Sequence, residues 1–189
     1  MKKLLFIVVM YMVSLASFGQ SEPEFELEPY IFNTTDSTFA NPLPCENTYL
    51  KSKVATSMFL VGVGKIKSYY YIKGEKSSLV IDNKNCNIII NTGGNSPQQI
   101  LSLIKLERLE TKRRWKTGEM GAFTGSSFNE DNSIPLKYKK YGENSVIIDI
   151  SQLEHGDYCI AISSMMTNMK SSKVYTFRIK KNKNNDDND

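Results

Sequence analysis

The sequence has few of the residues that most enzymes use for chemistry. It contains one histidine, one tryptophan and three cysteines in 189 residues. His155 is therefore the sole candidate for a histidine base, and it lies in a turn, with Cys159 as the nearest cysteine in sequence. No Gly-x-Ser-x-Gly elbow and no glycine-rich phosphate loop before a helix occurs. These absences predict that the protein is not an enzyme and has no catalytic residues. A hydrolase with spatially paired acids is the less favoured alternative, because such pairs leave no sequence pattern.

The cysteines give no metal-binding pattern either. Cys45, Cys86 and Cys159 form no Cys-x-x-Cys motif and no cluster with a histidine, so we expect no metal site and no cofactor. An odd number of cysteines leaves at least one thiol unpaired or intermolecular, and the spacing does not choose among the three single bridges.

The first residues have the pattern of a signal peptide. Lys2 and Lys3 precede the apolar stretch Leu4 to Leu15, and Ala16 to Gly19 supplies small residues for cleavage before Gln20. The apolar stretch is shorter than the roughly 20 residues of a membrane span. We therefore expect export to the periplasm, the cell surface or the medium, with no membrane span after signal removal. An uncleaved N-terminal anchor is the alternative.

The charge balance argues against one class of partner. The net charge is +4, and it falls to +2 when the two lysines of the signal peptide are removed. A nearly balanced chain of this kind, exported from the cell, is not expected to bind nucleic acid. The partner is expected to be a protein or a glycan.

Composition divides the chain into four parts. Residues 1–19 form the signal peptide, and residues 20–46, rich in glutamate and proline, are expected to be an extended lead-in with one edge strand. Residues 47–180 are expected to form a β-sandwich domain. Residues 181–189 contain only Asn, Asp and Lys and are expected to be a disordered polar tail.

From Thr48 onward the sequence reads as short strands separated by polar turns. Strand signals recur about every ten residues, which is typical of a sandwich or a barrel. Residues 97–106 are ambiguous between helix and strand, because Ile100, Leu103 and Ile104 fit helical spacing whereas Leu101 and Leu103 fit one face of a strand. We favour the strand. The overall expectation is an all-β, immunoglobulin-like Greek-key β-sandwich of seven to nine strands.

The most informative stretch is Val146 to Ser163. A β-branched run, Val146 to Ile150, leads into a turn at 153–158 and then into an alternating strand that begins at Tyr158. The pattern Leu153-x-x-Gly156-x-Tyr158 is similar to a tyrosine corner, in which the hydroxyl of the tyrosine bonds backbone a few residues upstream. A plain hairpin turn is the alternative. Alternation predicts that Tyr158, Ile160 and Ile162 face the core while Cys159 and Ala161 face the opposite way.

A basic, aromatic stretch supplies the candidate ligand-binding residues. Lys112 to Lys116 contains the single tryptophan, and we predict a surface where Trp115 stacks on a sugar ring while Arg113 or Arg114 holds a hydroxyl or carboxylate. Tyr70 is added because alternation sends it to the opposite face from Tyr69 and Tyr71, so aromatic rings lie on both faces of that strand. The alternative is that the tryptophan and tyrosines pack into the core.

The segments Ser78 to Ile90, Leu103 to Gly118 and Ile134 to Ile162 together resemble a family of small, uncharacterised exported proteins of Bacteroides-type bacteria. The motif that carries the resemblance is the late strand Leu-x-x-Gly-Glu-Tyr, here Leu153-Glu-His-Gly156-Asp157-Tyr158 with Asp in place of Glu and His155 where Pro is common. The resemblance implies an immunoglobulin-like sandwich and no activity. We therefore expect a non-enzymatic binding or interaction module, or else a carbohydrate-binding module that uses Trp115 and exposed tyrosines.

Overall fold

The protein is all-β in a computed structural model that describes residues 21–54, 65–82, 84–121, 125–127, 133–166 and 172–180. The described residues form fourteen strands, one helical turn, α3 (Pro97–Ile100), and one 3-10 turn, η1 (Ser163–Met166). The predicted signal peptide, the polar tail and a strand predicted at Met58 to Val63 lie outside the described residues. The expected count of seven to nine strands is too low, since the described residues also form short strands, seven of which have two to five residues.

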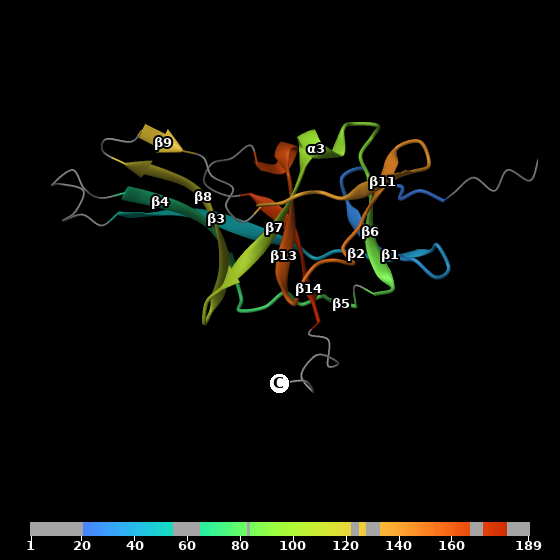
Figure 1. Cartoon of the computed structure of the whole chain (residues 1–189), viewed down its shortest axis with the longest axis horizontal. Coiled ribbons are helices and arrows are strands. Elements are labelled where there is room, and N and C mark those ends of the chain that lie inside the picture. Colours follow the sequence, from blue (N-terminus) through green and yellow to red (C-terminus); the bar gives the residue numbers. More distant parts are fainter. Residues whose placement is uncertain are drawn as a thin grey trace, which may run out of the picture.

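One sheet has five antiparallel strands. Their order across the sheet is β11 (Tyr138–Tyr141), β12 (Ser145–Ile148), β6 (Cys86–Asn91), β1 (Pro29–Asn33) and β2 (Phe39–Pro42). The run of isoleucines in β6 and β12 explains why these strands lie inside the sheet, since β-branched side chains pack well on a pleated surface. In Figure 1 this sheet occupies the right-hand part of the molecule.

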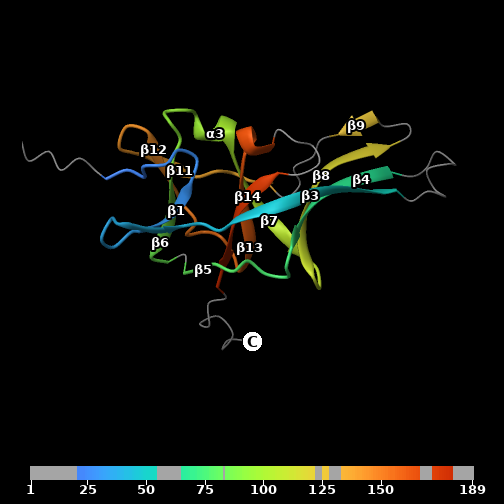
Figure 2. The ribbon, with the colours of Figure 1, turned by 180° about the vertical axis from the view of Figure 1, so that it is seen from behind.

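The second sheet closes into a barrel. Its six strands, in order around the barrel, are β7 (Leu101–Arg108), β13 (Gly156–Ile162), β14 (Lys173–Ile179), β3 (Cys45–Val54), β4 (Lys65–Lys73) and β8 (Lys112–Gly121). Closure comes from the pairing of β8 with β7, where Glu107 lies opposite Arg114 and Arg108 opposite Arg113. Three short strands, β5 (Val80–Ile81), β9 (Gly125–Ser127) and β10 (Ser133–Ile134), extend this sheet. Seen from behind, β3 runs from beside β14 out toward β4 and β8 (Figure 2).

The barrel corrects the expectation of a simple sandwich. The five-stranded sheet does pack on β7, β13 and β14, and the two share a core that contains Ile88, Ile148, Ile160 and Phe177. The barrel has a second interior, lined by residues that include Tyr70, Trp115 and Val174. A pattern of short strands fits a sandwich and a barrel equally well, because both present alternating faces.

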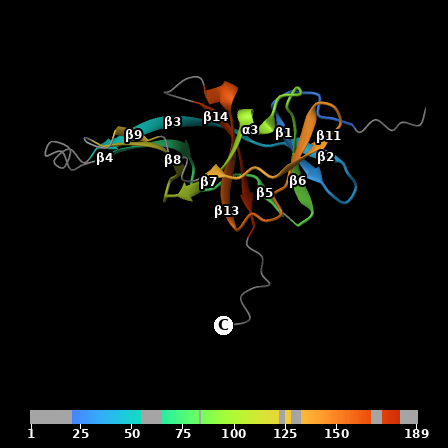
Figure 3. The same ribbon diagram turned by 45° about the horizontal axis from the view of Figure 1, so that its top comes forward.

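Strand β13 separates the two cores. Tyr158, Ile160 and Ile162 belong to the core shared by the two sheets, as alternation predicts. Cys159 and Ala161 point the other way, and they are buried as well, because that side is the barrel interior. In Figure 3 the strand lies between the five-stranded sheet and the barrel strands β3, β4 and β8.

The turn before β13 has the hydrogen bond of a tyrosine corner. The Tyr158 hydroxyl donates to the carbonyl oxygen of Glu154 at 2.9 Å, and the Tyr158 ring stacks on Phe177 with centroids 5.5 Å apart. The ring is therefore buried while its polar group keeps a partner. The prediction for the turn at 153–158 is confirmed in this respect.

The ambiguous segment at 97–106 contains both elements. Residues Pro97–Ile100 form the turn α3, and the chain then becomes extended at Leu101 and continues as β7. Pro97 suits the first turn of a helix because its missing N–H has no intrahelical partner there. The β-branched and leucine-rich residues that follow pair with β13 along its length.

Residues 20–46 supply more of the fold than a lead-in with one edge strand. Strand β1 is not at an edge, because it lies between β6 and β2. Closer to the N-terminus, the Glu22 carboxylate accepts hydrogen bonds from the N–H of Glu143 (2.6 Å), the N–H of Asn144 (3.0 Å) and the hydroxyl of Ser145 (2.6 Å). Gly142 has φ +65, and a Cβ there would lie 2.1 Å from Glu22 Oε1, so this turn requires glycine.

Among the described residues, no helix is long and apolar enough to cross a membrane.

Candidate functional site

Trp115 and Tyr70 lie inside the barrel. They face each other from β8 and β4, with ring centroids 5.1 Å apart, and only 4% of Trp115 and 8% of Tyr70 is exposed. Ile72, Leu106 and Val174 belong to the same cluster. Neither ring offers a free face to a sugar, so these two residues form part of the core.

Arg113 is also buried, with 1% of its surface exposed. Its guanidinium donates to the carboxylate of Glu46 at 2.7 Å and to the carbonyl oxygens of Lys73 and Gly74 at 3.1 Å each. These contacts explain how a charged side chain is accommodated there. Because it is paired within the protein, Arg113 is not positioned to hold a ligand.

The pair of Arg113 and Glu46 is part of a buried polar network. The Thr176 hydroxyl bonds to Glu46, the Ser77 hydroxyl lies 2.8 Å from that of Thr176, and the Ser77 N–H donates to Asp157 at 2.7 Å. The network ties β3, β8, β13 and β14 together at one end of the barrel. Its role is structural.

Arg114 lies on the outside of the barrel, on the opposite face of β8. Two of its nitrogens donate to the carboxylate of Glu107, at 2.7 and 2.8 Å, and its guanidinium lies 4.4 Å from the centroid of the Tyr69 ring. The hydrogen bond to Glu107 is the main reason why the pKa of Arg114 is raised. The structure thus brings three of the four predicted residues together in the interior and leaves only Arg114 outside.

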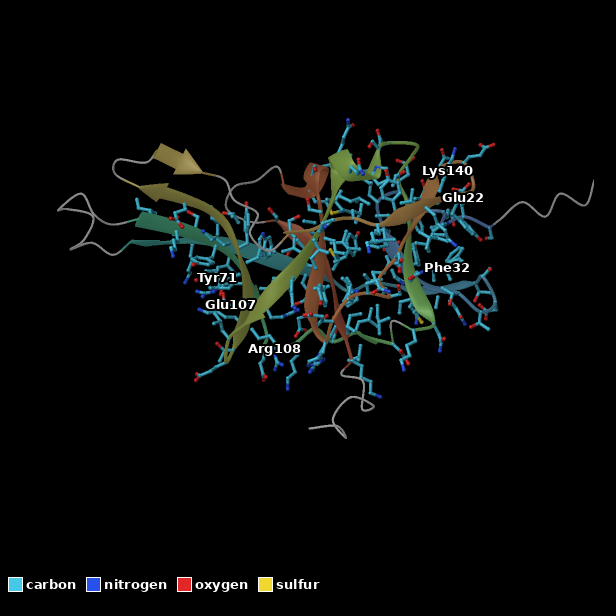
Figure 4. All side chains as sticks on the ribbon, in the orientation of Figure 1. Glu22, Phe32, Tyr71, Glu107, Arg108 and Lys140 are labelled. Carbon is cyan, nitrogen blue, oxygen red and sulfur yellow. The ribbon has the colours of Figure 1, made fainter. Side chains whose placement is uncertain are left out.

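The outer surface around Arg114 is the candidate site, and we call it the tyrosine face. Its centre consists of Tyr49 from β3 and of Tyr69 and Tyr71 from β4. The Tyr49 and Tyr71 rings are stacked with centroids 5.6 Å apart, and those of Tyr69 and Tyr71 are 6.2 Å apart. Tyr71 and Glu107 lie close together at this side of the molecule in Figure 4. The prediction that Tyr69 and Tyr71 lie on the opposite face of their strand from Tyr70 is confirmed.

Cationic side chains cover the tyrosine rings. Lys51 Nζ lies 5.5 Å from the centroid of the Tyr49 ring, and Lys112 Nζ lies 4.7 Å from that of Tyr71. These distances are typical of cation–π contacts. Tyr71 is only 1% exposed as a result of its neighbours, whereas Tyr49 and Tyr69 are half-buried. Lys51 and Lys112 thus lie directly over the tyrosine rings.

The tyrosine face carries an excess of positive charge. Among the side chains that the structure describes, the register of the four strands places six cations and two carboxylates on it: Lys51, Lys67, Lys73, Lys112, Arg114 and Lys116, with Glu107 and Glu119. Glu119 pairs with Lys116 at 2.9 Å, and Glu107 pairs with Arg114. Within the part of the chain that the structure describes, the other four lysines form no ion pair. A face of this kind attracts anions.

Sequence reasoning missed Tyr49 and the lysines that β3 and β4 contribute to this face. Their signal is the alternation Tyr49-x-Lys51 on β3 and Lys67-x-Tyr69-x-Tyr71 on β4, but it becomes a surface only when Tyr49 pairs with Tyr71. Strand pairing of this kind is not encoded in either segment alone.

The described residues give no catalytic constellation around His155. Its Nδ1 lies 2.8 Å from the carbonyl oxygen of Ile179, which only accepts hydrogen bonds, so Nδ1 carries the proton. The imidazole thus joins the turn before β13 to the end of β14. No group of three or more His, Cys, Asp or Glu side chains among the described residues is arranged to hold a metal ion.

No family model matches the chain, and no curated protein or solved structure shows significant similarity to it.

Proposed function

We propose that this chain is an exported, non-enzymatic binding module whose tyrosine face binds an acidic polysaccharide of the cell envelope. The observation that carries the proposal is the arrangement of six cations around three neighbouring tyrosine rings on one side of the barrel. The earlier hypothesis of sugar stacking on Trp115 is replaced, because that ring is buried. The tyrosines that contribute are Tyr49 and Tyr69.

The form of the face favours a polymer with regularly spaced charges. Side chains on one face of a strand recur about every 7 Å, and neighbouring strands lie about 5 Å apart, so the cations form a grid. The lysines over Tyr49 and Tyr71 have restricted freedom before binding, which reduces the entropy lost when a ligand binds. Half-buried tyrosines add apolar contact with the carbohydrate ring.

The expected export supports a glycan over a nucleic acid, since the predicted signal peptide directs the chain out of the cytoplasm. N-terminal sequencing of the exported protein tests this part of the proposal. A mature chain that begins at Gln20 supports it, and an intact N-terminus contradicts it. We further propose that the five-stranded sheet and the strands that pack on it, with the tyrosine corner at 153–158, form an immunoglobulin-like sandwich. This part would be related to the exported Bacteroides-type proteins, and the remaining barrel strands would be an addition to it.

The binding experiment compares two matched double variants. Lys51 and Lys67 are exposed on the tyrosine face, whereas Lys140 and Lys180 are exposed elsewhere, so Lys51→Ala/Lys67→Ala and Lys140→Ala/Lys180→Ala have the same net charge. Affinity for polygalacturonate is measured at several salt concentrations. We expect the first variant to bind about tenfold more weakly or worse, with a shallower dependence on salt, and the second to bind as the parent does.

Three outcomes contradict the proposal. Equal losses in both variants would mean that net charge, and not the tyrosine face, determines binding. No binding by the parent protein to polygalacturonate or to a sulfated glycan at low salt would remove the acidic polysaccharide as the ligand. Nucleic acid, measured in parallel, must bind more weakly than the glycan.

A further inference from the structure

A hollow of about 340 Å³ opens on the outer surface of the five-stranded sheet. Lys84, Thr34, Asn87, Lys137 and Asp149 are among its lining residues. The sheet that carries it lies at the opposite end of the molecule from β4 and β8, which carry the tyrosine face (Figure 1). The hollow is therefore separate from the site proposed above, and its volume is at the lower end of the range for small-ligand pockets.

The lining of the hollow has a small apolar part, which we call its floor. It includes Ile147 of β12, which is buried and packs with Phe32 and Ile89 on the outer side of the sheet. Lys139 lies directly opposite Ile147 in the register between β11 and β12. The carbonyl of Lys137 accepts a hydrogen bond from the N–H of Asp149 at 2.8 Å, so Lys137 and Asp149 lie side by side next to the pair of Lys139 and Ile147. Regular strand pairing thus places the charged side chains at the rim of the hollow.

The rim is polar and has a net positive charge. Lys84, Lys137 and Lys139 are exposed, and none of them forms an ion pair among the residues that the structure describes. Asp149 is the one carboxylate in the lining, and its Oδ1 accepts the N–H of Ser151 at 2.9 Å. Hydrogen bonds from Ser151, followed by the charges of Lys137 and Lys139, lower the pKa of Asp149, so this carboxylate is ionised at neutral pH.

Two further groups add directional hydrogen bonding. The Asn87 Oδ1 accepts the N–H of Ile150 at 3.3 Å, which orients the amide and leaves its Nδ2 group as a donor. The Thr34 hydroxyl donates to the carbonyl of Asn85 at 3.0 Å and keeps its acceptor lone pairs. The hollow therefore offers cations, one anionic acceptor, a neutral donor and a neutral acceptor around an apolar floor.

We propose that this hollow is a second binding site, for a single uronic-acid sugar such as the end of an acidic glycan. The carboxylate of the sugar would pair with Lys137 or Lys139, its hydroxyls would bond to Asp149 and Asn87, and the C–H face of its ring would lie on Ile147. A simple inorganic anion makes no use of the apolar floor or of Asp149. A neutral sugar makes no use of the three lysines.

The site can be tested with the mature full-length chain by calorimetric or NMR titration with methyl β-D-glucuronide. Methyl β-D-glucoside and acetate serve as comparison ligands, since one lacks the carboxylate and the other lacks the ring and hydroxyls. We expect the glucuronide to bind and each comparison ligand to bind at least about tenfold more weakly. Equal binding by the glucoside or by acetate would overturn the assignment, as would the absence of binding by the glucuronide.

Neighbouring lysines on β11 provide the matched control. Lys139 lines the hollow, whereas Lys140 lies opposite Val146, whose side chain belongs to the inner core, so Lys140 points to the other side of the sheet. Lys139→Ala should weaken glucuronide binding on the order of tenfold, and Lys140→Ala should leave it unchanged. Equal effects of the two variants would contradict the site.

This result is independent of the tyrosine face. The variant Lys51→Ala/Lys67→Ala should bind methyl β-D-glucuronide as the parent does, even if it no longer binds polygalacturonate. If that variant no longer bound the monosaccharide, the sugar would have to bind at the tyrosine face, and the proposal of a second site would be overturned.

Discussion

The guanidinium of Arg113 lies 2.7 Å from the carboxylate of Glu46, at a place where Arg113 is 1% exposed. The pair joins β8 to β3, two strands of the closed barrel that are not neighbours. Arg113 Nη1 and Asp157 Oδ2 are buried without a hydrogen-bond partner among the described residues, so the network around the pair is not fully satisfied within the protein. Such a network is sensitive to the removal of any one member.

Removal of one partner of this pair should cost more than removal of both. We expect Glu46→Met to destabilise the fold by about 3 kcal/mol, because Arg113 then remains buried without its carboxylate, and Arg113→Met/Glu46→Met to lose less than the sum of the single variants. Urea unfolding gives the free energies. Arg114→Met, which breaks the more exposed pair with Glu107, should cost about 1 kcal/mol or less. Additive losses in the double variant would count against a coupled pair.

Loss of the corner hydroxyl should weaken the fold without changing its shape. Tyr158→Phe removes the hydrogen bond to the Glu154 carbonyl and keeps the buried ring, so we expect a loss of about 1 kcal/mol in thermal or urea unfolding. Tyr138→Phe is the control, because Tyr138 is 37% exposed and should tolerate the change. A Tyr158→Phe protein as stable as the parent would show that the corner bond contributes nothing.

The Glu22 contact predicts a dependence of stability on pH. Burial alone would raise the pKa of Glu22, but the hydrogen bonds from Ser145, Glu143 and Asn144 outweigh it and hold the pKa below its ordinary value of 4.5. Because the folded pKa is lowered, this contribution to stability is present above pH 4.5 and is lost as the pH falls through the folded pKa.

Glu22→Gln tests this dependence. We expect the variant to be less stable than the parent at pH 7, and the difference between the two should shrink as the pH is lowered from 5 toward 3. Urea unfolding at a series of pH values gives the difference directly and cancels the other carboxylates. A difference that stays constant over this range would mean that Glu22 acts without its charge.

The three thiols should differ in reactivity. Burial raises the pKa of each, most strongly for Cys159, which is completely buried, whereas Cys45 is exposed and Cys86 is half-buried. Since the thiolate is the reactive form, a thiol reagent should modify Cys45 first, Cys86 next and Cys159 only after unfolding. Mass spectrometry of partly labelled protein gives the order. Early labelling of Cys159 would show that the barrel opens in the native state.

The faces of individual strands could be predicted from the sequence, but the surroundings of those faces could not. Alternation in Tyr158 to Ile162 correctly separates two sets of side chains. The second set is buried because β3, β4 and β8 close a barrel around it, and those strands begin 44 to 111 residues before β13. Nothing local to β13 indicates that closure, so the sequence predicts the core between the sheets but not the second interior inside the barrel.

The same cause explains the outcome for the candidate site. The prediction for Lys112 to Lys116 put Trp115 at one surface with Arg113 or Arg114, whereas in the structure Trp115 and Arg114 lie on opposite faces of β8. Which face becomes the interior depends on the short contact where Glu107 and Arg108 pair with Arg114 and Arg113. Without that contact, an exposed tryptophan beside free arginines is a reasonable interpretation. With it, Trp115 belongs to the core, and the proposed binding surface is the one formed by the tyrosines on the outside.

The position of β13 between the two cores determines how this protein can be dissected. Its odd-numbered and even-numbered residues complete different interiors, so no cut in the chain yields two halves that each keep a whole core. A fragment containing the six barrel strands alone would expose Tyr158 and Ile160, and a fragment that lacks β3, β4 and β8 would expose Cys159 and Ala161. The two proposed binding sites therefore belong to one indivisible unit, in which the distance between them is fixed by the fold itself.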